Sequence, residues 1–462
     1  MDKGDVLSMR KSLSIKTLKN NIQRLLSLVI LLVTVITVAV SCTPNNSDPA
    51  KSPSYLFNTP GATPQATPEK AELTYTDITL LNAGDIMYHG PQLNSAYNSS
   101  TGKYDFSDNF QYMKSIVSAA DYAVANFETT TANQIKYESY PSFNSPLETL
   151  TSIKDTGYDM LLFANNHCYD KKKDGFVATL NQFKNFGFDY IGGKLSEEEK
   201  SYMVKDVNGI KLGMMNYADT LTSKNGQYYT INGITINDGC DKLMDIYMRN
   251  EYEKLYSEVS ERIADMKEQG ADIIIMYIHW GDEYKLEPVS SQTIVAQKLC
   301  DLGVDVIIGG HPHVIEPMEI LTSQTNPEHS TICFYSLGNY ISNQNRLTLS
   351  NSNKQYTENG LTVTLTIRKY STGDVFVKAI DYTPTWVHRY YCSDGYNNYN
   401  VVPLRQAIAN PDSYGLYNSS FGLEHAKAAL ALTDPVFEQA VMSYNTSMAD
   451  EISVFSQAYD AN

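Results

Sequence analysis

One stretch decides the fold class of this chain: Val304-Asp305-Val306-Ile307-Ile308-Gly309-Gly310-His311-Pro312-His313-Val314. Its first half is apolar and β-branched, as is typical of a buried central strand in a parallel sheet. The two glycines let the backbone turn where the strand ends, which is where open α/β sheets bind their ligands. Neutral imidazole is the commonest metal ligand, so His311 and His313 are candidate ligands. Taken alone, however, such a pair is more often part of an ordinary surface loop.

Apolar strands alternate with helical segments on both sides of this stretch. The expected strands cover residues 78–83, 122–127, 160–164, 189–191, 210–217, 273–278 and 332–339, with an antiparallel pair at 361–368 and 375–382. The expected helices cover 110–121, 147–156, 171–186, 242–269 and 289–302. This alternation predicts the α/β class. The polar residues 219–243 are expected to form an insertion or a lid.

The two ends of the chain differ from this pattern. Basic residues precede an apolar run from Leu25 to Val40, and small residues then lead to Cys42. This pattern is typical of an export signal, and its run is shorter than the about 20 residues of a transmembrane helix. It resembles a bacterial lipoprotein signal over residues 1–42 with Cys42 lipidated, and an uncleaved membrane anchor is the alternative. Both place the remaining chain outside the cytoplasmic membrane.

Beyond Cys42, composition predicts the division of the chain. Residues 43–72 are rich in Pro, Ser and Thr and predict a disordered tether. The folded domain is expected over 73–382. Residues 383–462 are rich in Tyr and Asn, become helical at about 423–444, and are expected to form a C-terminal extension without chemistry.

Charge and cysteine content exclude some functions. The formal net charge is −16, and residues 1–41 contribute +4, which leaves −20 for the remainder. Nucleic acids are therefore not expected partners, because binding them requires clustered positive charge. The five cysteines after Cys42 are widely spaced and contain no Cys-x-x-Cys pair, so they predict neither a disulfide framework nor a thiolate zinc site. We expect most of them to be buried apolar residues.

Polar residues follow the ends of several predicted strands. These residues are Asp85, Glu128, Asn166 with His167, His279, and His311 with His313. Strand ends at one edge of a sheet converge, so one site could receive them all. Carboxylate, amide and imidazole groups together bind divalent metals such as Mn, Zn or Fe. Two ions about 3.5–4 Å apart would clamp a phosphoryl or carbonyl group and lower the pKa of a bound water. Each residue alone also fits a turn, a cap or a buried histidine.

Six ordered motifs resemble the bacterial capsule-synthesis CapA family over about residues 77–345. They are Gly84-Asp85-Ile86-Met87, Asn126-Phe127-Glu128, Asn165-Asn166-His167 with Asp170, His279-Trp280-Gly281-Asp282-Glu283, Gly310-His311-Pro312-His313-Val314 and Ser336-Leu337-Gly338-Asn339-Tyr340. That family is associated with poly-γ-glutamate capsule synthesis, and its fold resembles that of calcineurin-like metallophosphoesterases. The resemblance implies an α/β/β/α sandwich.

The resemblance also implies a role for each candidate residue. Asp85 and His313 would bind a first metal, and Glu128 stands where a bridging Asp is usual. Asn166, His279 and His311 would bind a second metal, and His167 would be the general acid, oriented by Asp170.

Two positions depart from the phosphoesterase pattern. Met87 occupies the place of a histidine ligand and is a poor ligand for a hard metal. His89 is the nearest substitute, and the bridging Asp is replaced by the longer Glu128. These changes leave open a site with two metals, one metal, another metal or no catalysis.

The leading hypothesis is a lipid-anchored, metal-dependent hydrolase or transferase of capsule or cell-surface polymer metabolism. Its substrate would be an anionic polymer or a phosphoester, and other capsule-synthesis membrane proteins are candidate partners. The alternative is a non-catalytic polymer-binding or capsule-assembly lipoprotein with a degenerate metal site, which Met87 favours. A third hypothesis is a nucleotidase-like enzyme at the cell surface.

Overall fold

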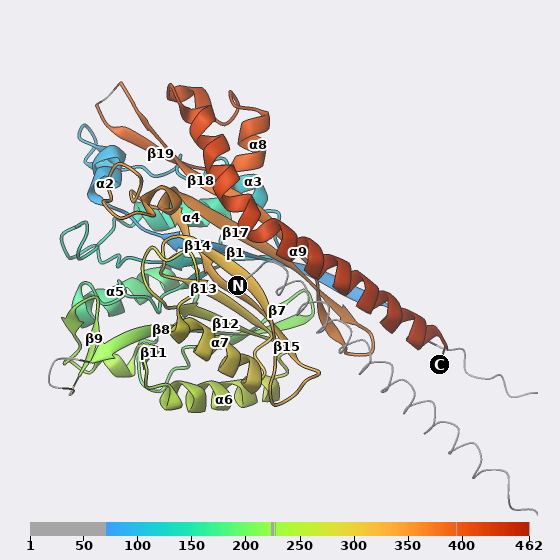
Figure 1. The fold of residues 1–462 in the computed structure, drawn as a ribbon. Helices are drawn as coiled ribbons and strands as arrows, with labels where there is room; N and C mark the ends of the chain where they lie inside the picture. Colours follow the sequence, from blue (N-terminus) through green and yellow to red (C-terminus); the bar gives the residue numbers. More distant parts are fainter. Residues whose placement is uncertain (1–70, 223–225, 227, 394, 462) are drawn as a thin grey trace, which may run out of the picture. The chain divides into compact units, whose positions relative to one another are not determined.

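Two β-sheets packed face to face form the centre of the fold, with helices on their outer faces (Figure 1). The computed structural model describes residues 71–222, 226, 228–393 and 395–461. The predicted signal, Cys42 and the predicted tether up to residue 70 lie outside the described residues. None of the helices in the described ranges has both the length and the apolar composition needed to cross a membrane.

The first sheet has the order β19-β18-β17-β1-β4-β5-β6, and β16 pairs with β1. Its strands are β1 Tyr75–Ile86, β4 Tyr122–Phe127, β5 Met160–Leu162, β6 Asp189–Ile191, β16 Asn339–Ile341, β17 Asn359–Tyr370, β18 Val375–Tyr391 and β19 Asn397–Pro403. β1, β4, β5 and β6 are parallel, so their carboxyl ends lie at one edge. A separate pair, β2 Tyr97–Asn98 and β3 Lys103–Tyr104, lies outside both sheets.

The second sheet has the order β10-β9-β8-β12-β13-β15-β14, and β7 and β11 also pair with β8. Its strands are β7 Met203–Val207, β8 Ile210–Thr222, β9 Tyr229–Ile231, β10 Ile234–Thr235, β11 Ile246–Met248, β12 Ile273–His279, β13 Val306–Gly310, β14 Ile315–Thr322 and β15 Ser330–Leu337. The central strands β8, β12, β13 and β15 are parallel. The stretch that decides the fold class therefore does contain a buried central strand.

Alternating side chains of the strands pack against different layers. Ile78 and Leu80 of β1 share a core with Leu212 of β8 between the two sheets, whereas Leu81 faces the helical layer with Leu180. The helices are α2 Gly90–Ala96, α3 Lys114–Val117, α4 Glu148–Thr156, α5 Lys172–Asn185, α6 Glu253–Glu268, α7 Ser290–Leu302, α8 Leu404–Ala409 and α9 Gly422–Ala461. The expected α/β/β/α sandwich is confirmed.

Two expected helices are shorter than their sequence patterns suggest. The helix expected over 242–269 begins at Glu253, because residues 246–248 form β11 and pair with β8. The helix expected over 110–121 is reduced to α3, with turns before it. Cys168, Cys240, Cys300 and Cys333 are buried thiols, as expected.

The C-terminal residues complete the first sheet and do not form a separate extension. The expected boundary after residue 382 falls inside β18, which continues to Tyr391 and pairs with β19. Tyr399 and Val401 of β19 are buried against the helical layer of this sheet. The Tyr/Asn-rich composition therefore conceals a strand whose residues from Tyr399 to Pro403 are all buried.

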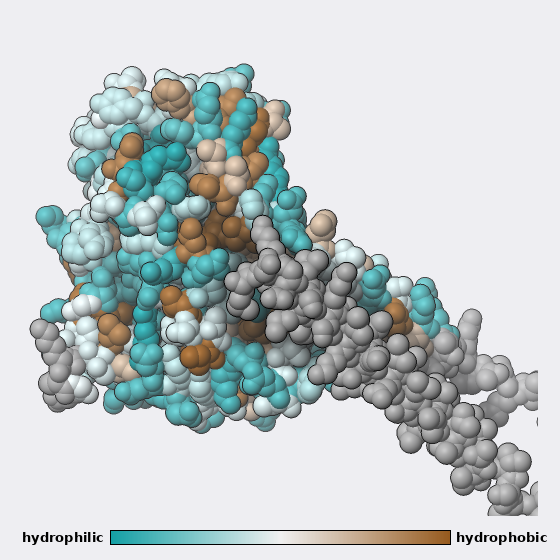
Figure 2. Space-filling model, in the orientation of Figure 1, coloured by the Kyte–Doolittle hydropathy of each residue, from teal (hydrophilic) through white to brown (hydrophobic). Residues whose placement is uncertain are grey.

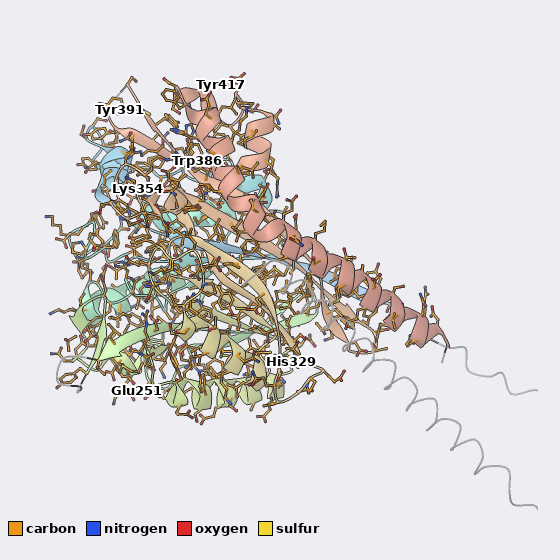
Figure 3. The ribbon with its side chains drawn as sticks, in the orientation of Figure 1. Glu251, His329, Lys354, Trp386, Tyr391 and Tyr417 are labelled. Atoms are coloured by element: carbon orange, nitrogen blue, oxygen red, sulfur yellow. The ribbon has the colours of Figure 1, made fainter. Side chains whose placement is uncertain are left out.

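Helix α8 and the first turns of α9 cover the end of this sheet. Figure 3 shows Trp386 of β18 beside α8 and α9, where it packs with Leu404 and Ala426. Tyr391 and Tyr417, labelled at the outer end of the same region, are exposed. The face drawn in Figure 2 is mostly hydrophilic, with apolar side chains in small groups.

A buried carboxylic acid between β14 and α7 gives a testable pH dependence. Burial raises the pKa of Glu316 to about 8, although Gln292 Nε2 donates to its Oε2 at 2.6 Å. The folded pKa lies above the unfolded value of 4.5, so stability is lost as the pH rises through this window. Glu316→Gln should therefore increase the free energy of unfolding by on the order of 2 kcal/mol at about pH 7, and by almost nothing near about pH 4. Urea unfolding at both pH values measures this, and an equal difference at both would contradict it.

Candidate metal centre

The candidate residues meet where parallel strands of both sheets end. Asp85 lies at the end of β1, Glu128 directly follows β4, and His279 ends β12. After β13 the backbone turns sharply, with φ of +97° at His311 and +57° at His313. Gly310 precedes this turn, and a Cβ there would lie 2.7 Å from Asp85 Oδ1. A side chain at this position would therefore displace the carboxylate.

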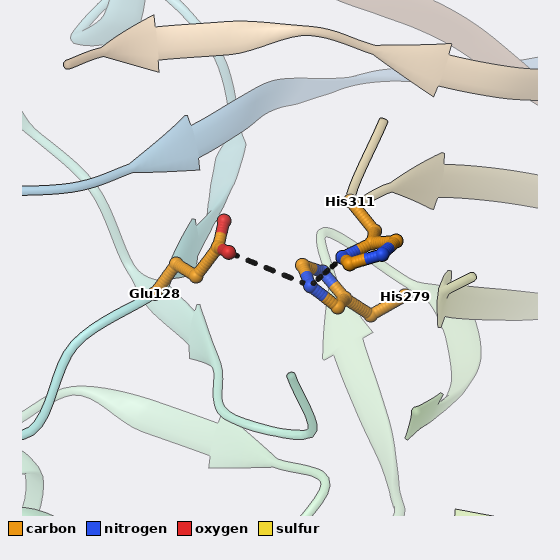
Figure 4. A group of neighbouring side chains, drawn as sticks. All are labelled: Glu128, His279 and His311. Carbon is orange, nitrogen blue, oxygen red and sulfur yellow. Dashed lines mark hydrogen bonds and ion pairs between the residues drawn. The ribbon is translucent and has the colours of Figure 1, made fainter. Parts of the chain in front are cut away.

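Glu128, His279 and His311 form the first group of potential metal ligands (Figure 4). His279 Nε2 lies 3.6 Å from Glu128 Oε1 and 3.1 Å from His311 Nδ1. Asn166 Oδ1 is 3.1 Å from the same His279 nitrogen. One ring nitrogen thus faces three potential ligand atoms, and a single N–H can satisfy only one of them.

Asp85, Glu128 and His313 form the second group, so Glu128 belongs to both. His313 Nδ1 lies 3.3 Å from Asp85 Oδ2, and its Nε2 lies 3.8 Å from Glu128 Oε1. Asp85 also accepts hydrogen bonds from Asn126 Nδ2 at 2.8 Å and from the His311 backbone at 3.2 Å. His313 therefore points towards Asp85, as a first-metal ligand would.

Glu128 is buried in surroundings where a cation would compensate the negative charge of its carboxylate. Its side chain is fully buried, and neither carboxylate oxygen has a hydrogen-bond partner among the described residues. Burial, followed by the negative charge of Asp85, raises the pKa of Glu128 well above its usual range. Burial likewise holds the pKa of His279 and His311 well below the usual range, which keeps both rings neutral. Neutral imidazoles around an uncompensated carboxyl group fit one or two divalent cations.

His167 and Asp170 lie beside the two groups. His167 Nδ1 is 2.7 Å from Asp170 Oδ2, and both side chains are buried. The Phe143 backbone N–H also donates to Asp170 Oδ2, at 2.6 Å. His167 is therefore fixed through one ring nitrogen, which leaves Nε2 for proton transfer.

A cavity of about 300 Å³ adjoins this histidine. Its lining combines histidine, other aromatic, amide and carboxylate side chains. The lining residues are Met87, His89, Tyr140, His167, Glu283, Tyr284, His313, Asn343, Gln344, Thr348 and Leu349. Both His167 and the candidate ligand His313 line the cavity. It is the natural place for a substrate of the neighbouring site.

Met87 and His89 both line this cavity. Met87 is buried, and its sulfur lies 4.0 Å from Ser342 Oγ. His89 is the N-cap residue directly before α2, and its Nδ1 accepts a hydrogen bond of 3.4 Å from the Asn343 backbone. Burial lowers the pKa of His89 to about 3, so it is neutral. His89 belongs to neither of the two ligand groups among the described residues.

Several residues that support the site were not among the sequence-based candidates. Asn126 bridges Asp85 and Asn165, whose Nδ2 donates to Asn126 Oδ1 at 3.1 Å. Its position two residues before Glu128 was the available signal, because alternate residues of a strand share a face. Arg249 ties Asp219 to Asp282 in the loop after His279, with distances of 2.8 and 2.7 Å. No local pattern marks this arginine, because its partners are distant in sequence.

Comparison with known proteins agrees with this arrangement. A sequence model of the family described as bacterial capsule synthesis protein PGA_cap matches residues 79–344, more than half of the chain. The chain is 28% identical over 240 residues to the PGA biosynthesis protein CapA of Bacillus subtilis (strain 168), covering 51% of this chain and 57% of that protein. It is 28% identical over 273 residues to the capsule biosynthesis protein CapA of Bacillus anthracis, covering 58% and 60%. The matches thus span less than two thirds of these relatives. The chain belongs to the PGA_cap family of bacterial capsule synthesis proteins, which has a metallophosphatase-like α/β fold.

Proposed function

We propose that this protein is a metal-dependent hydrolase or transferase that acts on a phosphoester or amide linkage in the metabolism of poly-γ-glutamate or another surface polymer. One observation carries the proposal. Glu128 is a fully buried carboxyl group that belongs to two histidine-containing ligand groups and has no hydrogen-bond partner of its own among the described residues. A protein with no use for a cation would be destabilised by such a group.

Different residues of the site would bind the metal and transfer the proton. Asp85, Glu128 and His313 would hold one cation, and Asn166, His279 and His311 would complete a second site around Glu128. Bound metal supplies Lewis-acid activation of the substrate oxygen and of a water or polymer nucleophile. When both ring nitrogens of His167 carry hydrogen, it would donate the Nε2 proton to the leaving group, while Asp170 accepts the hydrogen bond from Nδ1.

The cavity beside His167 would receive the polymer. Its described lining offers amide, hydroxyl and aromatic groups and one carboxylate, Glu283. A polyanionic chain would therefore depend on the metal for charge compensation. The relatives' names, PGA biosynthesis and capsule biosynthesis protein, support a polymer of this kind.

We further propose that the protein acts outside the cytoplasmic membrane and is anchored through a lipid on Cys42. The support is the order of basic, apolar and small residues before Cys42. Other capsule-synthesis membrane proteins would then be within reach as partners. The proposal fails if the protein is recovered in the soluble fraction of the cells without detergent.

Loss of a ligand should remove activity. Asn166→Ala and His311→Ala are expected to lower turnover by at least about 100-fold on any substrate that the parent accepts, because each removes a direct ligand. The measurement is a screen of phosphoesters and γ-glutamyl polymers, with elemental analysis of each purified protein. Retention of parental turnover by both variants would exclude this mechanism.

Met87 and His89 favour a second candidate function, a non-catalytic polymer-binding or capsule-assembly lipoprotein. Met87 stands at the position of a phosphoesterase ligand, and His89 does not replace it in either described group. Elemental analysis distinguishes the two candidates. About two equivalents of Mn, Zn or Fe together with turnover support the enzyme, whereas polymer binding by metal-free protein supports the binder.

A further inference from the structure

A short hairpin from the polar segment 219–243 reaches the His167–Asp170 pair. Strands β9 and β10 are joined by Asn232-Gly233, whose φ angles are +45° and +72°. Asn-Gly with positive φ at both residues is the preferred tight turn between antiparallel strands. β9 also pairs with the end of β8, and Ile231 and Ile236 are buried beside it. The hairpin is therefore anchored in the second sheet and in the core.

The Asn232 side chain points from this turn towards Asp170 and Pro141, next to the Nδ1 side of His167. Its Nδ2 donates to Asp170 Oδ1 at 2.9 Å and to the Pro141 carbonyl at 3.0 Å. The two hydrogens of the amide nitrogen are then both used. The same nitrogen lies 3.2 Å from His167 Nδ1. His167 Nδ1 must therefore direct its own hydrogen to Asp170 Oδ2 and cannot receive one from Asn232.

These contacts account for both oxygens of Asp170. Oδ2 accepts from His167 Nδ1 and from the Phe143 backbone, and Oδ1 accepts from Asn232. A buried carboxylate with donors on each oxygen cannot rotate without losing a hydrogen bond. Its orientation determines where the ring of His167 points, because a partner on one ring nitrogen fixes the tautomer and the ring plane.

We propose that Asn232 is a positioning residue that fixes His167 through Asp170, and that the β9–β10 hairpin is a built part of the catalytic site. The inference rests on the proposed proton transfer by His167. Asn232 does not touch the ligand groups, so its loss should leave metal binding intact. Its loss should leave the His167 ring less firmly held in one orientation.

The chain offers a matched control for this residue. Asn208-Gly209 forms the turn between β7 and β8, with φ of +50° and +91°. Asn208 Nδ2 donates to Asp121 Oδ1 at 3.0 Å on an exposed surface. Glycine accepts positive φ without strain, so Asn232→Gly and Asn208→Gly both keep their turns. Each variant removes one asparagine side chain, and only the first lies beside Asp170.

The first measurement does not depend on turnover. Proton NMR of the full-length protein should show a low-field, slowly exchanging signal from His167 Nδ1–H, identified by its absence in His167→Ala. Asn232→Gly should increase its exchange with solvent by at least about tenfold, because the carboxylate that accepts it is no longer held. Asn208→Gly should leave the rate unchanged.

The second measurement uses turnover. Asn232→Gly is expected to lower kcat by about tenfold with KM within about twofold, the range seen when a partner behind a site residue is lost. In a His167→Ala background the same change should have no further effect, because residues that act through one group are not additive.

The outcomes separate this inference from the proposed function. A faster-exchanging proton in Asn232→Gly, in a protein whose parent has no activity, supports the positioning role and rejects the enzyme. Unchanged proton exchange in Asn232→Gly, a parent without a slowly exchanging signal, or equal loss of kcat with and without His167 would each overturn the inference.

Discussion

Replacing Glu128 with glutamine is expected to weaken metal binding strongly at both positions of the site. Glu128 is the residue common to the two ligand groups, and its Oε1 lies 3.6 Å from His279 Nε2 and 3.8 Å from His313 Nε2. A glutamine amide carries no negative charge, and its NH2 group is a hydrogen-bond donor that replaces one of the two possible ligand oxygens. Metal affinity should fall by more than about 100-fold, beyond the effect of losing an outer partner. Elemental analysis after gel filtration and calorimetric titration with Mn²⁺ or Zn²⁺ measure the loss.

Glu316→Gln is the matched control, because it changes another buried carboxyl group with a raised pKa outside the ligand groups. It should keep the parental metal content. The Glu128→Gln protein should also remain folded, since its neutral side chain avoids burying a charge. A folded Glu128→Gln protein with parental metal content would show that Glu128 is not a shared ligand.

The sequence predicted those parts of the site that depend on where strands end. Asp85, Glu128 and His279 follow apolar runs, and parallel strands bring such ends to one edge. This explains why residues as distant in sequence as Asp85 and His311, 226 positions apart, were expected together and are in contact. The turn was expected at Gly309-Gly310, but both glycines belong to β13 and the backbone turns one residue later, at His311.

Other features depend on pairings that no local pattern contains. Asn232 reaches Asp170 because Leu221 of β8 pairs with Thr230 of β9. Its Asn-Gly turn between short apolar runs was the one signal that could have revealed a hairpin. Ile246–Met248 follows a helical pattern in sequence, yet its place beside β8 makes it a strand. Tertiary pairing overrides local preference in such short segments.

The last helix was expected from the sequence but is longer than predicted, and it lies outside the matched family region. α9 extends to Ala461, past the expected end at about residue 444, and it packs against β18 and β14 of different sheets. Phe437 is fully buried, and its ring stacks on Phe334 of β15 at 6.0 Å between centroids. Asn445 bonds to the backbone N–H and carbonyl of Ile380, both at 2.8 Å. α9 therefore contributes to the core between the two sheets.

Phe437→Ala should lower the free energy of unfolding by about 3–5 kcal/mol, because it leaves a cavity beside Phe334 in the shared core. Phe421→Ala is the control, since that ring directly precedes α9 and is 64% exposed, and it should change stability by about 0.5 kcal/mol or less. Urea unfolding followed by circular dichroism measures both. Because Phe437 packs with residues of both sheets, the whole domain should unfold in one transition at lower urea. Equal stability of the two variants would mean that Phe437 does not stabilise the core between the two sheets.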